Sequence, residues 1–235
     1  MKSDFTYSNP EFDQYATGYD AALARGLSVS GEEKEFFARG RIDWLAGCLR
    51  RLREQPKSIL DFGCGIGSAT PLWFDTLGVE QTIGVDNSAA SLEVARRNFE
   101  HLTAQFFLLD EYKPDGQLDL AFCNGVFHHI PPEGRTAALN YIHRSLRPNG
   151  LFSFWENNPW NPGTRYVMSR IPFDRDAITL SHHEAKRLIK SNGFEVLSVD
   201  FLFIFPRSLR WFRVVEPTFS MFPFGAQYQV LCRKS

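Results

Sequence analysis

The chain has 235 residues and a formal net charge of -1, which suits one domain with a substantial core and does not favour nucleic-acid binding. Neither a signal peptide nor a membrane span is expected, because no stretch approaches the roughly 18 consecutive apolar residues of a span. The four cysteines lack the spacing of disulfide frameworks and metal sites, so we expect reduced thiols, no metal site and a cytoplasmic location.

Two amphipathic helices are predicted ahead of the first strand. In the first, over residues 9–23, Tyr15 and Tyr19 lie on the apolar stripe, where they either close over a substrate or pack in the core. The second begins near Ser30 with capping-box spacing, and Arg41 falls within its apolar face. Burying an unpaired guanidinium is costly, so we expect a carboxylate partner for Arg41, either from a bound cofactor or from the protein.

An alternation of short apolar runs and helical patterns follows. It predicts an α/β fold in which right-handed crossovers build a mostly parallel sheet with helices on both faces. Strands are expected at residues 59–62, 82–86, 105–109, 119–124 and 151–155, and helices at residues 68–77, 88–100 and 133–146.

The alternation ends after residue 155. A long polar segment, residues 156–180, precedes a helix that begins at Ser181. Two last strands are expected at residues 195–205 and 225–233, on either side of an aromatic-rich segment. The connection between them is short, so the last strand should pair antiparallel with the sheet.

The turn after the first strand combines glycines with an acid. Gly63, Gly65 and Gly67 lead from the strand into a helix, an arrangement that brings backbone close to a ligand. Asp61 precedes them, and its charge disfavours a pyrophosphate but suits a cofactor with an ammonium group. Ser68 stands where the dinucleotide fingerprint would have its third glycine, which argues against a nicotinamide oxidoreductase.

Polar side chains also close the next three strands. Asp86 ends the second strand, where a carboxylate would accept hydrogen bonds from ribose hydroxyls. Asp110 ends the third strand, where it could bind an adenine amino group, and Asn124 ends the fourth. Because parallel strands place their carboxyl ends at one edge of a sheet, we expect one ligand site there.

Five segments carry a family resemblance: LDFGCGIG at residues 60–67, GVDNS at 84–88, LDE at 109–111, LDLAFCNG at 118–125 and LRPNGL at 146–151. They resemble the motifs of class I S-adenosylmethionine-dependent methyltransferases of the small-molecule type, over about residues 55–156. The resemblance implies a Rossmann-like seven-stranded sheet of order 3-2-1-4-5-7-6 with strand 7 antiparallel. It also implies S-adenosyl-L-methionine as the cofactor.

The resemblance also implies the cofactor contacts. Asp61 would lie near the amino group of the methionine part, and Asn124 would lie near the sulfonium. With Arg41 as the partner of the cofactor carboxylate, the expected cofactor-binding set is Arg41, Asp61, Gly63, Cys64, Gly65, Asp86, Asn87, Asp110, Glu111 and Asn124.

We expect a single methyltransferase domain over residues 1–235. Residues 1–54 would form an N-terminal helical cap and residues 55–156 the cofactor-binding core. Residues 157–180 and 206–224 would be insertions that cover the substrate and exclude water.

Candidate catalytic groups lie at the carboxyl edge of the predicted sheet. Glu156 ends the fifth strand and His129 follows the fourth, so both are candidates for a general base. The alternatives are an ion pair for Glu156 and packing against the cofactor for His129. The candidate substrate contacts are Tyr15, Tyr19, His128, His183 and Arg207.

The expected activity is methyl transfer to a small-molecule acceptor, with oxygen as the first choice of acceptor atom. The aromatic segment 206–224 favours an aromatic, lipid-like or glycan-linked acceptor, and its arginines could bind an anionic group or a membrane surface peripherally. An N-methyltransferase of a small amine and a catalytically silent, methyltransferase-like binding subunit are the alternatives. The oligomeric state is left open.

Overall fold

The computed structural model describes residues 31–171, 174 and 177–235. Its strands are β1 (Ser58–Phe62), β2 (Gln81–Asp86), β3 (Ala104–Leu108), β4 (Leu118–Asn124), β5 (Leu146–Asn157), β6 (Phe194–Leu202) and β7 (Gln227–Lys234). Its helices are α3 (Lys34–Leu52), α4 (Thr70–Leu72), α5 (Ala89–Asn98), α6 (Pro132–Ser145), α7 (Pro162–Arg170) and α8 (His182–Ser191), with a π-helical turn η2 (Trp73–Leu77) and a 3-10 helix η4 (Arg207–Phe219).

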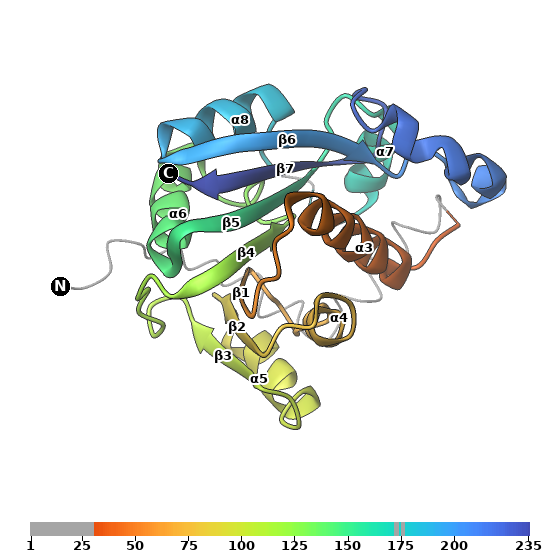
Figure 1. Ribbon diagram of the computed structural model, residues 1–235. Helices are drawn as coiled ribbons and strands as arrows, with labels where there is room; N and C mark the ends of the chain where they lie inside the picture. The colour runs from red at the N-terminus through yellow and green to blue at the C-terminus, as the bar shows by residue number, and fades with distance from the viewer. Residues whose placement is uncertain (1–30, 172–173, 175–176) are drawn as a thin grey trace.

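The strands form one sheet with helices on both faces (Figure 1). Their order is β3-β2-β1-β4-β5-β7-β6, which confirms the predicted topology. Strand β7 pairs antiparallel with β5 and β6, while the other neighbours pair in parallel. The carboxyl ends of β1, β2 and β4 therefore meet at one edge, as the sequence predicted.

Apolar side chains cover both faces of this sheet. Helices α6 and α8 pack on one face, where Leu139 and Ile189 are fully buried. Helix α3 and turn η2 pack on the other face through Leu45 and Trp73. Covering both faces explains why β1 is buried at every position and reads as a continuous apolar run.

Some element boundaries differ from the prediction. Strand β5 begins at Leu146 rather than at residue 151, because residues 147–150 form a bulge within the strand: Leu118 pairs with Leu146, but Leu120 pairs with Leu151. Within that bulge Asn149 has a φ of 62°, in the left-handed region.

Helix α7 lies within the long polar segment 156–180, in which no helix was predicted. The Asn161 side chain accepts a hydrogen bond from the Thr164 backbone N–H, and Pro162 follows at the first helical position. An Asn-Pro pair is a helix start signal, so the sequence did carry evidence for this helix.

Helix α3 begins at Lys34, with Glu33 at its N-cap. The expected helix over residues 9–23, with Tyr15 and Tyr19, and the expected helix start at Ser30 lie outside the described residues. Within the part of the chain that is described, no helix is both long and apolar enough to cross a membrane.

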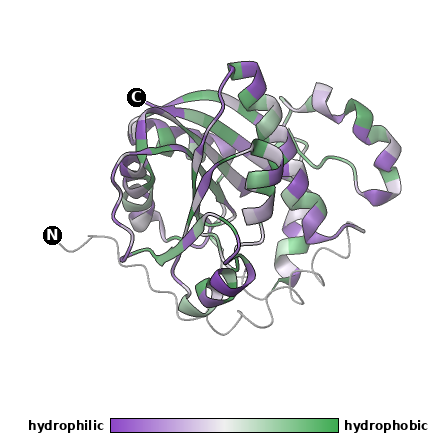
Figure 2. Ribbon diagram, turned by 60° about the horizontal axis from the view of Figure 1, so that its bottom comes forward, coloured by the Kyte–Doolittle hydropathy of each residue, from purple (hydrophilic) through white to green (hydrophobic). Residues whose placement is uncertain are grey.

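The 3-10 helix η4 projects from the sheet beside α7 (Figure 1). Hydrophilic and hydrophobic residues are mixed along it (Figure 2), and Trp211 and Phe212 are exposed. All five aromatic side chains of segment 206–224 are exposed, so they do not contribute to the protein interior.

Candidate active site

The glycine turn after β1 forms backbone hydrogen bonds with β2. The N–H groups of Gly63 and Cys64 donate to the Val85 carbonyl oxygen at 2.8 and 3.1 Å. Gly63 has a φ of 76°, and a Cβ there would lie 2.3 Å from Val126 Cγ2, so the turn needs glycine. At Gly65, by contrast, a Cβ would meet no atom within 4 Å, because this part of the turn faces open space.

That space is a cavity of about 570 Å³ at the carboxyl ends of β1, β2 and β4, which we call the first cavity. Most of the predicted cofactor-binding residues line it. They are Arg41, Asp61, Gly63, Cys64, Gly65, Asp86, Asn87 and Asn124.

Asp110 and Glu111 are the two members of the predicted set that do not line the first cavity. Both lie on the exposed turn after β3, where Glu111 Oε2 accepts a hydrogen bond from the Leu108 N–H at 3.1 Å. Leu109 lines the cavity instead. The cofactor-binding roles of the two acids stay predictions.

Asp86 joins the glycine turn to the start of α5. Its Oδ2 accepts from the Gly65 N–H at 2.8 Å, and its Oδ1 accepts from the Ser88 N–H at 2.9 Å. A carboxylate can accept about four hydrogen bonds, so Asp86 can orient the turn and also receive a ligand hydroxyl.

Asp61 is a buried acid in the wall of the first cavity, with 5% of its surface exposed. Burial raises the pKa of its carboxyl to about 7, although the Trp73 indole N–H, 3.4 Å from Oδ2, acts in the opposite direction. A cationic ligand group beside Asp61 would favour the ionised carboxylate.

A second cavity of about 380 Å³ adjoins the first. Five residues line both cavities, namely Lys34, Arg41, Asn124, Gly125 and His129. Phe36 and Phe37 of α3 and Phe203 after β6 form an aromatic wall of the second cavity, with ring centroids 5.0 to 5.9 Å apart. Gly40 makes room for this wall, because a Cβ there would lie 2.7 Å from Cε1 of Phe203.

Glu156 lies behind the second cavity and lines neither cavity. It is 1% exposed, and its Oε1 accepts from the Phe127 N–H at 2.8 Å. Its Oε2 lies 2.5 Å from His128 Nδ1. Glu156 therefore positions the turn after β4 and the His128 ring, and the contacts of its carboxylate disfavour the expected role as a base that touches the acceptor.

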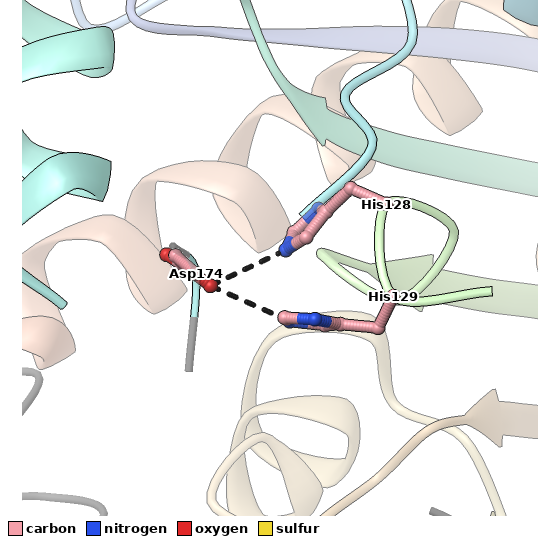
Figure 3. Close-up of side chains that lie close together, drawn as sticks. All are labelled: His128, His129 and Asp174. Carbon is pink, nitrogen blue, oxygen red and sulfur yellow. Dashed lines mark ion pairs between the residues drawn. The ribbon is translucent and has the colours of Figure 1, made fainter. Parts of the chain in front are cut away.

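His128, His129 and Asp174 come together at the edge of the second cavity (Figure 3). Asp174 Oδ1 lies 3.5 Å from His128 Nε2 and 3.4 Å from His129 Nε2. Burial lowers the pKa of His128, but Glu156 and Asp174 outweigh burial and raise it. Burial also lowers the pKa of His129. For this histidine burial outweighs the opposing effects of Asp174 and Glu156, so the pKa lies below its usual value.

No sequence pattern pointed to Asp174 as a site residue. It lies in the segment after α7, far along the chain from the two histidines, and no spacing rule connects them. Only the folded chain brings the three side chains together.

Two further predicted substrate contacts lie outside both cavities. His183 is exposed beside the Trp160 ring, and Arg207 is exposed and donates to the Gly31 carbonyl oxygen at 3.2 Å. Arg213 of the same arginine series lines the second cavity instead, with its guanidinium 4.3 Å from the Phe36 ring centroid and Nη1 2.9 Å from Glu32 Oε1.

Residues 59–150 match the model of a family described as a methyltransferase domain. The chain is 27% identical over 115 residues to a trans-aconitate 2-methyltransferase of Azoarcus sp. (strain BH72), covering 49% of this chain and 45% of that protein. It is 28% identical over 156 residues to a malonyl-[acyl-carrier protein] O-methyltransferase of Halalkalibacterium halodurans, covering 63% and 54%. The chain thus spans about half the length of the curated relatives it matches.

Among solved structures, the fold matches a TehB-like S-adenosylmethionine-dependent methyltransferase from Corynebacterium glutamicum with a TM-score of 0.59. The match covers 97% of this chain and 100% of that chain at 18% identity, so it concerns the fold alone. Sheet order, glycine turn and family match agree: residues 59–150 form a methyltransferase domain, and the chain has the fold of S-adenosylmethionine-dependent methyltransferases.

Proposed function

We propose that the chain binds S-adenosylmethionine in the first cavity and transfers its methyl group to an oxygen atom of a small molecule in the second cavity. The observation that carries the proposal is the junction of the two cavities, where Asn124 and His129 line both. S-adenosylmethionine supplies a methyl group on a sulfonium whose departure leaves a neutral thioether. An in-line displacement needs the acceptor on the opposite side of that methyl group, and adjoining cavities would provide this alignment.

The residues of the first cavity fit this cofactor. Gly65 leaves open space at the turn, and Asp86 offers a carboxylate for ribose hydroxyls. Asp61 suits the ammonium group of the methionine part. Among the described residues, Asn124 Oδ1 is a buried oxygen without a hydrogen-bond partner, and a ligand at the junction would satisfy it.

The second cavity supports an acceptor with an apolar, ring-containing body. The wall formed by Phe36, Phe37 and Phe203 would pack against such a body, and His129 and Arg213 are among the polar residues that line the same cavity. Oxygen as the acceptor atom is further supported by the similarity to an O-methyltransferase. His129, which lines both cavities, is the residue that we propose to activate the acceptor hydroxyl.

The proposed domain organisation follows from the same cavities. Helix α7 and Asp174 of segment 157–180, and Pro206 and Arg213 of segment 206–224, line the second cavity. Helix α3, from the proposed N-terminal cap, lines both. We therefore assign the substrate cover to these three parts of one domain.

A turnover assay tests the proposal. The full chain is incubated with S-adenosylmethionine and separate panels of hydroxylated aromatics, carboxylic acids and amines, and S-adenosylhomocysteine is quantified. We expect turnover with hydroxylated aromatics. Turnover restricted to amines would indicate an N-methyltransferase, and cofactor binding without turnover on any panel would indicate a binding subunit.

Cofactor affinity should depend on pH through Asp61. Below its pKa of about 7 the carboxyl of the ligand-free chain carries a proton, and the cofactor ammonium group requires the carboxylate, so affinity should rise with pH. Between about pH 8 and pH 5.5 we expect a loss of about 30-fold, measured by calorimetry with S-adenosylhomocysteine. Asp61→Asn should bind more weakly and lose this pH dependence, whereas a flat profile for the unaltered chain would contradict the assignment.

A further inference from the structure

We propose that His128, His129 and Asp174 bind a divalent metal ion of the zinc type at the junction of the two cavities. The three side chains offer two imidazole nitrogens and one carboxylate oxygen, and these ligand atoms lie within 4.8 Å of one another. Two histidines and one carboxylate, with a further coordination position for water or substrate, are the ligand set of catalytic zinc sites.

The distances within the cluster fit an ion better than direct hydrogen bonds. The two separations from Asp174 Oδ1, 3.5 and 3.4 Å, exceed the usual length of a charge-assisted hydrogen bond. Metal–ligand bonds of about 2.1 Å in tetrahedral geometry place neighbouring ligand atoms about 3.4 Å apart. The two histidine nitrogens are thus spaced from Asp174 Oδ1 as ligand atoms around a metal ion would be (Figure 3).

Glu156 prepares His128 as a ligand. Glu156 Oε2 lies 2.5 Å from Nδ1 of the His128 ring. The other ring nitrogen, Nε2, therefore faces Asp174. Metal-binding histidines commonly make this contact with a carboxylate, because it fixes the ring orientation and raises the basicity of the ligating nitrogen. Both residues are at least 97% buried, so the pair does not reorient in solvent.

The backbone around the cluster is fixed as well. Arg135 Nε donates to the carbonyl oxygens of Phe127 and Ile130 at 3.1 and 2.9 Å, and Arg135 Nη2 donates to the Ile178 carbonyl oxygen at 2.6 Å. The Ile178 N–H donates to the His128 carbonyl oxygen at 2.8 Å. The turn that carries the histidines and the segment after Asp174 are therefore held against each other before any ion binds.

The position of the cluster indicates what the ion would do. All three residues line the second cavity, and His129 lines the first as well. An acceptor oxygen on the ion would lose its proton to water more readily, so with the ion bound the activating role would pass from the His129 ring to the ion. That oxygen would then attack the methyl carbon, the carbon–sulfur bond would break, and its electron pair would stay on sulfur. This role rests on the proposed function, whereas the binding of the ion does not.

Metal binding is tested on the full chain after removal of metal with a chelator. Calorimetry with Zn²⁺ and visible absorption with Co²⁺ should show one ion per chain and a tetrahedral Co²⁺ spectrum. Asp174→Asn and His128→Gln should weaken binding by about 100-fold or more, and Glu156→Gln by about 10- to 100-fold. His101→Gln, at an exposed histidine far from the cluster, should leave binding unchanged.

Circular dichroism identifies which variants are folded, and His129→Gln replaces any ligand variant that is not. The site is refuted if the folded unaltered chain shows no saturable binding, or if folded ligand variants keep full affinity. Methyl transfer that continues undiminished in metal-free protein would overturn the activating role while leaving the proposed function in place. Saturable metal binding without methyl transfer on any panel would support the site and refute the proposed function.

Discussion

Asp86→Ala is expected to weaken cofactor binding several hundred-fold. The substitution removes the proposed contact with the ribose hydroxyls, and it also removes the acceptor of the Gly65 and Ser88 N–H groups. Hydrogen bonds to a charged group contribute about 1.5–3 kcal/mol each, so losing the ligand contact and the support of the turn should cost about 3–4 kcal/mol. Calorimetry with S-adenosylhomocysteine measures the change.

Asp115→Ala is the matched control for this experiment. Asp115 is an exposed aspartate outside both cavities, with a hydrogen bond to the neighbouring Gln117 N–H. We expect its removal to leave cofactor affinity unchanged. A folded Asp86→Ala protein that binds as tightly as this control would refute the ribose role of Asp86.

Glu156→Gln is expected to lower the free energy of unfolding by about 3 kcal/mol, the lower end of the cost of removing one partner from a buried ion pair. The variant leaves the buried His128 ring with Asp174 as its one remaining anionic neighbour among the described residues and weakens the support of the turn after β4. Turnover should fall with it, because His129 is carried by the same turn. Cofactor affinity should change far less, since Glu156 does not line the first cavity.

Urea unfolding measures the stability change, and steady-state kinetics at saturating cofactor measures the turnover. Glu195→Gln, at an exposed position of β6, makes the same chemical change without a buried partner and should alter neither quantity. An unfolding free energy of Glu156→Gln equal to that of this control would show that the pair with His128 contributes nothing. An unaltered turnover would remove Glu156 from the catalytic machinery altogether.

The edge of the sheet where we propose the cofactor to bind could be predicted from the sequence, because the residues that mark it lie at strand ends and in a glycine turn, which local sequence patterns define. Asp61 and Asp86 end strands that read as apolar runs, and parallel strands bring such ends to one edge of the sheet. The glycine turn between them is a short-range feature with its own spacing. Asp110 does not follow this pattern. It lies two residues beyond the end of β3 and does not line the first cavity.

The acceptor side depended on contacts that no local pattern encodes. Asp174 follows α7 and meets two histidines that follow β4, and Arg213 rather than Arg207 of η4 lines the second cavity. For Glu156 the sequence correctly indicated a position at the carboxyl edge of the sheet. Its hydrogen-bond partners, Phe127 and His128, belong to the turn after β4, so Glu156 positions this turn.

The sequence by itself therefore predicted the alternation of strands and helices, because hydrophobic periodicity and turn residues act over a few positions. The sheet order and the methyltransferase domain were implied by the resemblance of five short motifs. The tertiary structure alone decided which side chains share the second cavity, because these contacts join elements distant in sequence, with burial and pairing set by the complete fold. The joined cavities around His129 and the cluster with Asp174 belong to this second kind of information.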